Sequence, residues 1–100
     1  MTTFRSRRLL DLAHDCTTCF ARFPHKCGGW QGCEPAHSDS QMFGRGIGYK
    51  SSDWAVAFLC HQAHLDLDKF DRYTKQAEWL AAFVRTQDYI WTNKLVKVAA

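Results

Sequence analysis

The stretch FLCHQAHLDLD, residues 58–68, decides which fold this chain can adopt. A helix is expected to begin near Cys60, and His64 follows four residues later, so the two side chains would lie on the same helical face. Ala63 stands where a C-x-x-C pair would have its second cysteine. The segment therefore offers two potential metal ligands, and a four-ligand zinc site would need two more from elsewhere in the chain.

Two further potential ligands lie in CTTC, which supplies Cys16 and Cys19. Structural zinc sites often combine such a knuckle with a second pair of ligands on a helix. We therefore expect Cys16, Cys19 and Cys60 to share one Zn²⁺. A redox-active CxxC normally belongs to a βαβ unit, which this sequence does not predict. Burial as small apolar residues is the other alternative for these cysteines.

The fourth zinc ligand is left open by the sequence. His61 is adjacent to Cys60, and neighbouring residues on a helix point about 100° apart, so these two share one ion poorly. His64 would complete a Cys3His site with Cys16, Cys19 and Cys60. Cys27 or Cys33 fits the vacant position equally well, and either would leave His64 free for another role.

The composition indicates one small folded domain. The chain has 100 residues, of which 46% are hydrophobic and 14% aromatic, and its formal net charge is +3. That charge permits contact with nucleic acid without requiring it. No run reaches the roughly 18 apolar residues of a membrane span, and the N-terminal segment has no apolar core typical of a signal peptide. We therefore expect a cytoplasmic protein with no membrane contact and with reduced cysteines; their odd number, five, also argues against a simple disulfide framework.

The distribution of residues along the chain predicts an α+β fold. A short helix is expected over residues 4–15, followed by an irregular region over 16–55 that holds all six glycines and both prolines. Within and just after it, CEPAHSD (33–39) and DWAVAFL (53–59) are the best strand candidates. The pattern becomes helical from about residue 60, and AEWLAAFVRTQDYIW (77–91) predicts a long amphipathic helix that covers a small metal module.

Four segments in this order resemble the HNH, or ββα-metal, nucleases, and most closely the small nuclease-like proteins that phages and prophages encode. They are CTTC (16–19), AHSD (36–39), GRGIGYKSSD (44–53) and LCHQAHLDLD (59–68). The family pattern is a knuckle, an Ala-His, a Gly- and Lys-rich loop ending in Asp, and then LCxxCHxxxD. The order and spacing of the segments make the resemblance more specific than any one of them.

The resemblance implies a single HNH-like domain over residues 1–100. An N-terminal helix would occupy residues 1–15, and the zinc knuckle with the ββα-metal module would occupy 16–70. A long C-terminal helix would occupy 71–100. Besides Ala63, the sequence departs from the family pattern at two positions. Asp39 stands where the pattern has an asparagine, and it adds negative charge near a site meant to receive phosphate. Ser52 stands where the pattern has a ring-bearing side chain.

Catalytic roles follow from the resemblance position by position. His37 matches the general base that activates water, and His64 matches the helix histidine that ligates a catalytic Mg²⁺ or Mn²⁺. Asp53 would orient the loop or the outer shell of this site. Hydrolysis of a phosphodiester needs a base and a metal ion that stabilises the charge on phosphorus, so the residue types suit the chemistry. Arg45 and Lys50 could then contact backbone phosphates.

The function implied by the resemblance is a metal-dependent DNA endonuclease with a structural Zn²⁺. Because Ala63 removes one expected zinc ligand, the alternative is an inactive nuclease-derived protein that blocks a host defence complex, as anti-CRISPR inhibitors do. A third reading is a plain nucleic-acid-binding zinc module. Trp30 and Tyr49, flanked by glycines and polar residues, are candidates for contact with DNA or with a host nucleoprotein complex.

Overall fold

The computed structural model describes residues 4–39 and 51–97, and these residues form three α-helices, a 3₁₀ turn and one two-stranded antiparallel sheet. The α+β class expected from the sequence is confirmed. In chain order the elements are α1 (Arg7–Asp15), η1 (Gly29–Gln31), β1 (Glu34–His37), β2 (Val56–Leu59), α2 (His61–Leu67) and α3 (Arg72–Thr92). None of the helices in the described part of the chain is long and apolar enough to span a membrane.

Both strands form where the sequence predicts them. β1 pairs with β2 so that Glu34 lies opposite Leu59 and His37 lies opposite Val56. Pro35 has no backbone N–H to donate to the neighbouring strand. This is tolerated because the backbone N–H and carbonyl of its partner Phe58 bond to Thr86 and Phe20 instead of to β1. The Phe58 carbonyl accepts from the N–H of Phe20 at 3.1 Å, so the segment after α1 is fixed beside the sheet.

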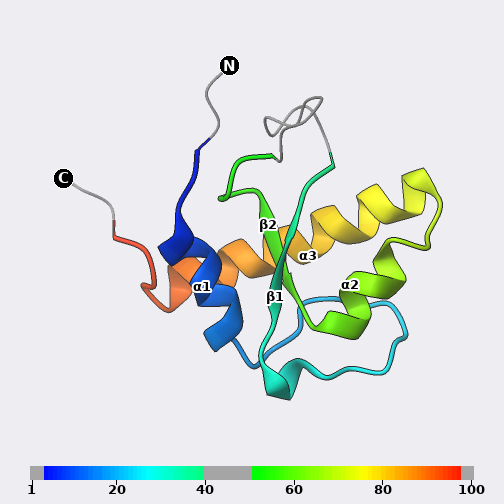
Figure 1. Cartoon of the computed structure of the whole chain (residues 1–100), viewed down its shortest axis with the longest axis horizontal. Helices are drawn as coiled ribbons and strands as arrows, with labels where there is room; N and C mark the ends of the chain where they lie inside the picture. The colour runs from blue at the N-terminus through cyan, green and yellow to red at the C-terminus, as the bar shows by residue number, and fades with distance from the viewer. Residues whose placement is uncertain (1–3, 40–50, 98–100) are drawn as a thin grey trace.

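The long helix α3 covers β2, whose four residues are all buried (Figure 1). Thr86 joins the two elements, since its Oγ1 accepts from the Phe58 N–H at 3.0 Å and donates to the Ala82 carbonyl at 2.8 Å. The indole of Trp79 donates to the Ala36 carbonyl at 2.8 Å, which attaches α3 to β1 as well. The amphipathic helix expected here thus places Trp79 and Ile90 in the core, whereas its Leu80 and Val84 are exposed.

Helix α2 follows β2 directly, and Cys60 is the residue that joins them. Cys60 is fully buried and caps the helix with its sulfur, which accepts from the N–H of Ala63 at 3.4 Å. A new cap, Asp71, then accepts from the N–H groups of Tyr73 and Thr74 and begins α3. The order strand, strand, helix thus positions Cys60 at the base of α2 and places the histidines of this helix beyond it.

Candidate metal centre

Three cysteines and one histidine converge beside the end of β2. The ligand atoms of Cys19, His25, Cys27 and Cys60 all lie within 4.8 Å of one another. In a tetrahedral zinc site with Zn–S bonds near 2.3 Å, the sulfur atoms lie about 3.8 Å apart. The four donors therefore need only a small inward movement to surround one ion. This Cys3His group could hold a metal ion, and its donor set suits Zn²⁺.

The loop between α1 and β1 brings these ligands to the sheet. Cys60 donates its backbone N–H to the sulfur of Cys19 at 3.3 Å, so the two sulfur-bearing residues are joined across 41 positions of sequence. Gly29 makes this approach possible. A Cβ added at Gly29 would lie 2.9 Å from the Cys19 nitrogen and 3.0 Å from the Cys19 Cβ, which is too close for a side chain. The 3₁₀ turn can therefore pack on Cys19 only with glycine at this position.

His25 is oriented for metal binding by its own backbone contact. Its Nδ1 lies 2.7 Å from the Phe23 carbonyl, and its Nε2 lies 3.6 Å from the Cys19 sulfur. A carbonyl can only accept a hydrogen bond, so Nδ1 carries the proton and Nε2 has the free lone pair. Metal-ligating histidines typically show this division between the two ring nitrogens.

The thiols of the centre differ in their readiness to ionise. Burial raises the pKa of Cys19 to about 11. Burial also opposes ionisation of Cys60, but the backbone N–H groups of Gly28 and Ala63 donate to its sulfur and lower the pKa to about 7. Cys60 is therefore the first of the two to become a thiolate, which is the form that binds a metal ion.

The sequence predicted Cys16, Cys19, Cys60 and His64 as the metal ligands, and the structure brings together two of these four. Cys16 is replaced by Cys27, which the sequence left open as an alternative, and His64 is replaced by His25, which it missed. The HKC spacing of His25 and Cys27 was the available signal.

Cys16 is held elsewhere because it caps the C-terminus of α1, where its N–H donates to the Ala13 carbonyl. Its sulfur and that of Cys33 each donate to the Thr18 carbonyl at 3.3 Å. Hydrogen bonding with Cys33 lowers the pKa of Cys16 to about 6, against the effect of burial. These two cysteines therefore form a separate buried pair beside the centre.

His64 turns to β1 instead of to the metal centre. Its Nδ1 lies 2.7 Å from Oε1 of Glu34, and the same oxygen lies 3.2 Å from Nδ1 of His61. The side chains of Glu34 and His64 are each one third exposed, while that of His61 is 73% exposed. One carboxylate and two imidazoles thus meet at the surface, just outside the cysteine group.

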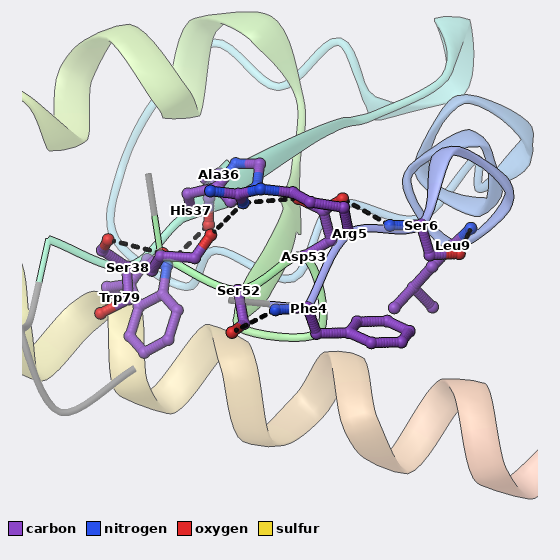
Figure 2. Close-up of polar contacts among 11 residues, drawn as sticks. Phe4, Arg5, Ser6, Leu9, Ala36, His37, Ser38, Ser52, Asp53 and Trp79 are labelled. Carbon is purple, nitrogen blue, oxygen red and sulfur yellow. Dashed lines mark hydrogen bonds and ion pairs between the residues drawn. The ribbon is translucent and has the colours of Figure 1, made fainter. Parts of the chain in front are cut away.

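At the other end of β1, His37 and Asp53 are brought together as candidate catalytic residues. His37 Nε2 lies 2.9 Å from Oδ1 of Asp53, whose other oxygen accepts from the N–H of Ser6 at 2.7 Å. Arg5 adds an ion pair at 3.1 Å, and Figure 2 shows Asp53 between these groups. Burial would raise the Asp53 pKa, but the hydrogen bonds from His37, Ser6 and Arg5 outweigh it and hold the pKa below its usual value.

The remaining predicted contact residues divide into two groups. Trp30 lies in the 3₁₀ turn and is 72% exposed, so it is accessible to a partner. Arg45, Tyr49 and Lys50 lie outside the described residues. The negative charge of Asp39 is partly neutralised by an ion pair with Lys75, which also forms an ion pair with Asp68 at 3.0 Å. Asp68 is thereby held by α3.

Comparisons with known proteins give no relative: no family model, curated protein or solved structure matches this chain. The functional argument therefore rests on the residues and their geometry.

Proposed function

We propose that the protein is a metal-dependent DNA endonuclease of the HNH type, which hydrolyses phosphodiester bonds. One observation carries this proposal: four ligands suited to zinc converge without His64. Had His64 been needed for the structural ion, it could not also have held a catalytic one. The Cys3His group has four potential ligands although position 63 is an alanine and not a cysteine. His64 therefore stays available for a catalytic ion.

His37 has the surroundings of a general base. The Asp53 carboxylate accepts a hydrogen bond from Nε2 of His37, so the neutral imidazole carries its proton on that nitrogen. Nδ1 then has the lone pair that can take a proton from an attacking water molecule. Asp53 is in turn fixed by Ser6 and Arg5, which hold the imidazole in a single orientation. Asp53 is a positioning residue in this scheme.

His64 would hold the divalent ion from the first turns of α2. Its ring is kept in place by Glu34, and one third of the side chain is open to solvent. His64 could supply one ligand to a divalent ion, and such an ion would supply positive charge to a phosphate group bound beside it. The order of β1, β2 and α2 supports the proposal, because it is the order of elements that the family resemblance implies.

The test is nicking of supercoiled plasmid DNA by the zinc-loaded protein with added Mn²⁺ or Mg²⁺. We expect nicking by the wild type, and His37→Ala should reduce its rate at least about 100-fold, as removal of a general base does. His14→Ala, in an exposed position of α1, is the matched control and should nick as the wild type does. Equal nicking by wild type and His37→Ala, or none by the wild type, would overturn the proposal.

A second candidate function is binding to a host nucleoprotein complex without catalysis, as in an anti-CRISPR inhibitor. It is favoured by the exposed apolar side chains on one face of α3, namely Tyr73, Leu80, Val84 and Trp91. Their spacing of seven, four and seven residues keeps them on one stripe, and such stripes on the surface often mark interfaces. This function predicts that the wild type inhibits target cleavage by a purified CRISPR effector complex, that Leu80→Asp abolishes the inhibition, and that His37→Ala does not.

A further inference from the structure

We propose that Cys16 and Cys33 are a site of reversible disulfide formation, at which hydrogen peroxide oxidises the two thiols. Both residues are buried free cysteines, and both lie outside the candidate metal centre. The proposed nuclease uses neither of them, so the site is independent of that function. The chain between the two cysteines carries Cys19, His25 and Cys27, which are three of the four candidate metal ligands.

The two cysteines are held side by side through both their backbones and their sulfur atoms. The backbone N–H groups of Cys16 and Cys33 both donate to the Ala13 carbonyl, each at 3.1 Å. The two sulfur atoms each lie 3.3 Å from the Thr18 carbonyl oxygen, and a hydrogen bond joins the two side chains. A disulfide has a narrow geometry and needs two backbones that already lie close together. This pair can therefore close the bond without a large movement of the chain.

Gly32 lets the start of β1 approach the end of α1 this closely. It has a φ of 100°, which strains any residue that bears a side chain, and a Cβ there would lie 2.7 Å from the His14 carbonyl oxygen. The chain before Cys33 can thus pass directly beside the C-terminus of α1, which Cys16 caps. The contact between the two cysteines therefore follows from the packing of a helix end against a strand.

An oxidant can reach the pair from an open cavity of about 500 Å³. Cys33 lines this cavity together with His14 and Gly32. Cys33 is 4% exposed and Cys16 is 1% exposed, so the Cys33 sulfur is the one that an entering molecule meets first. Hydrogen peroxide is small compared with the cavity, and it is therefore the oxidant that suits this approach.

The oxidation consumes one peroxide molecule for the two thiols. Hydrogen bonding between the side chains lowers the pKa of Cys16 to about 6 and raises that of Cys33, so Cys16 is the thiolate and Cys33 keeps its proton. As the Cys33 sulfur attacks one peroxide oxygen, the O–O bond breaks, hydroxide leaves, and the Cys33 proton passes to Cys16. The product at Cys33 is a sulfenic acid.

The second step forms the disulfide. The Cys16 sulfur attacks the Cys33 sulfur and the S–O bond breaks, so a second hydroxide leaves and takes the proton from Cys16. The hydroxide from the first step is neutralised by the proton that Cys16 had already lost to solvent. Each sulfur is thus oxidised by one electron, and the peroxide is reduced to two water molecules. A dithiol such as dithiothreitol reverses the reaction by thiol–disulfide exchange.

The disulfide would close the loop that carries most of the metal centre. A cross-link reduces the number of conformations that the enclosed segment can adopt. Cys19, His25 and Cys27 would then stay near their metal-binding arrangement even when one of them lets go of the ion. Zinc should therefore leave the oxidised protein more slowly than the reduced protein.

The test is treatment of the protein with hydrogen peroxide in excess Zn²⁺, followed by peptide mapping and by thiol counting before and after dithiothreitol. Bound zinc protects the thiols of Cys19, Cys27 and Cys60. We expect a disulfide that links Cys16 to Cys33, with the loss of both thiols and their recovery on reduction. Release of zinc to a chelator should be at least about threefold slower from the oxidised protein than from the reduced protein.

Two variants complete the test. Cys16→Ser leaves Cys33 without a partner, so peroxide should form no internal disulfide and should carry Cys33 to sulfenic and then sulfinic acid, which dithiothreitol does not recover. Thr17→Ser, at the exposed neighbouring position, is the matched control and should react as the wild type does. The peptide map of the wild type decides the question even if Cys16→Ser fails to fold.

Three results would each overturn the proposal. They are persistence of both thiols in peroxide, a wild-type disulfide that pairs Cys33 or Cys16 with another cysteine while zinc is bound, and equal rates of zinc release from the oxidised and reduced forms.

Discussion

The backbone N–H of Cys60 donates to the sulfur of Cys19 at 3.3 Å, and this one contact joins the loop after α1 to the start of α2. Cys60 also caps α2 with its own sulfur. The helix that carries His61 and His64 therefore begins at a ligand of the candidate metal centre. An ion bound to that centre would set where α2 begins, and with it the positions of both histidines relative to Glu34.

Gly29 should be required for metal affinity. Gly29→Ala places a Cβ 2.9 Å from the Cys19 nitrogen, so the turn or Cys19 has to move, and we expect zinc affinity to fall about tenfold or more. Gly28→Ala is the matched control, because its Cβ meets nothing nearer than the Gln31 side chain at 4.0 Å and its backbone N–H is retained. Competition with a chromophoric chelator measures both. Equal affinities for the two variants would contradict the packing argument.

Cys27 should stabilise the fold only through the metal. It is exposed, unlike the other cysteines, so Cys27→Ser removes little packing. With free zinc at a thousandfold excess over its dissociation constant, loss of binding removes about 4 kcal/mol from the free energy of unfolding. We therefore expect a clear drop in the melting temperature of Cys27→Ser in zinc and none after treatment with a chelator. A drop of the same size under both conditions would assign Cys27 a role other than binding the metal.

Zinc binding should release protons, and more of them below neutral pH. The Cys19 pKa is about 11, so its thiol has to lose a proton on binding at any pH near neutrality. The Cys60 pKa is about 7, so this thiol is largely ionised at pH 8 and largely protonated at pH 6. Apparent affinity should consequently fall more steeply with decreasing pH below 7 than above it. Calorimetry in buffers of different ionisation enthalpy counts the protons, and a constant number from pH 6 to 8 would contradict this assignment.

Asp53 should contribute stability that is lost in acid. Its pKa is lower in the folded chain than in the unfolded one, so the contribution is present above the unfolded pKa of about 3.9 and disappears as the pH falls through the folded pKa. Asp53→Asn should cost about 1–3 kcal/mol at pH 7 and flatten the acid limb of the stability curve.

The matched control for Asp53 is Asp11→Asn, which removes an exposed ion pair with Arg7. Surface pairs contribute little, so this variant should change the free energy of unfolding by less than about 1 kcal/mol. Urea denaturation between pH 3 and 7 measures both variants. If Asp11→Asn alters the acid limb as much as Asp53→Asn does, the buried network is not the cause.

Much of the fold could be predicted from local sequence because its signals are local. The periodic stripe around Trp79 predicted α3, and the short apolar run at Val56 to Leu59 predicted β2. Cys60 was identifiable as a candidate ligand because it sits at the junction of that strand with a helix. His37 and Asp53 were assigned to one site from the resemblance, and the structure places them 2.9 Å apart.

The rest of the site depends on a loop whose path no pattern encodes. Residues 20–28 have no regular structure, so the sequence shows the spacing of His25 and Cys27 but not the path by which His25 returns to Cys19. Cys16 lies outside the converging group because it caps the end of α1, where its sulfur contacts the Thr18 carbonyl beside Cys33. The contacts of Glu34 follow from strand register, which requires knowledge of both strands at once.

The measurement that tests the central claim most directly is zinc retention by two histidine variants, His25→Ala and His64→Ala, against a chelator of intermediate strength. The account predicts that His64→Ala keeps one tightly held equivalent, as the wild type does, and that His25→Ala loses it. If zinc is instead lost with His64 and kept without His25, the Cys3His centre is assigned to the wrong residues, and the nuclease proposal loses the observation that carries it.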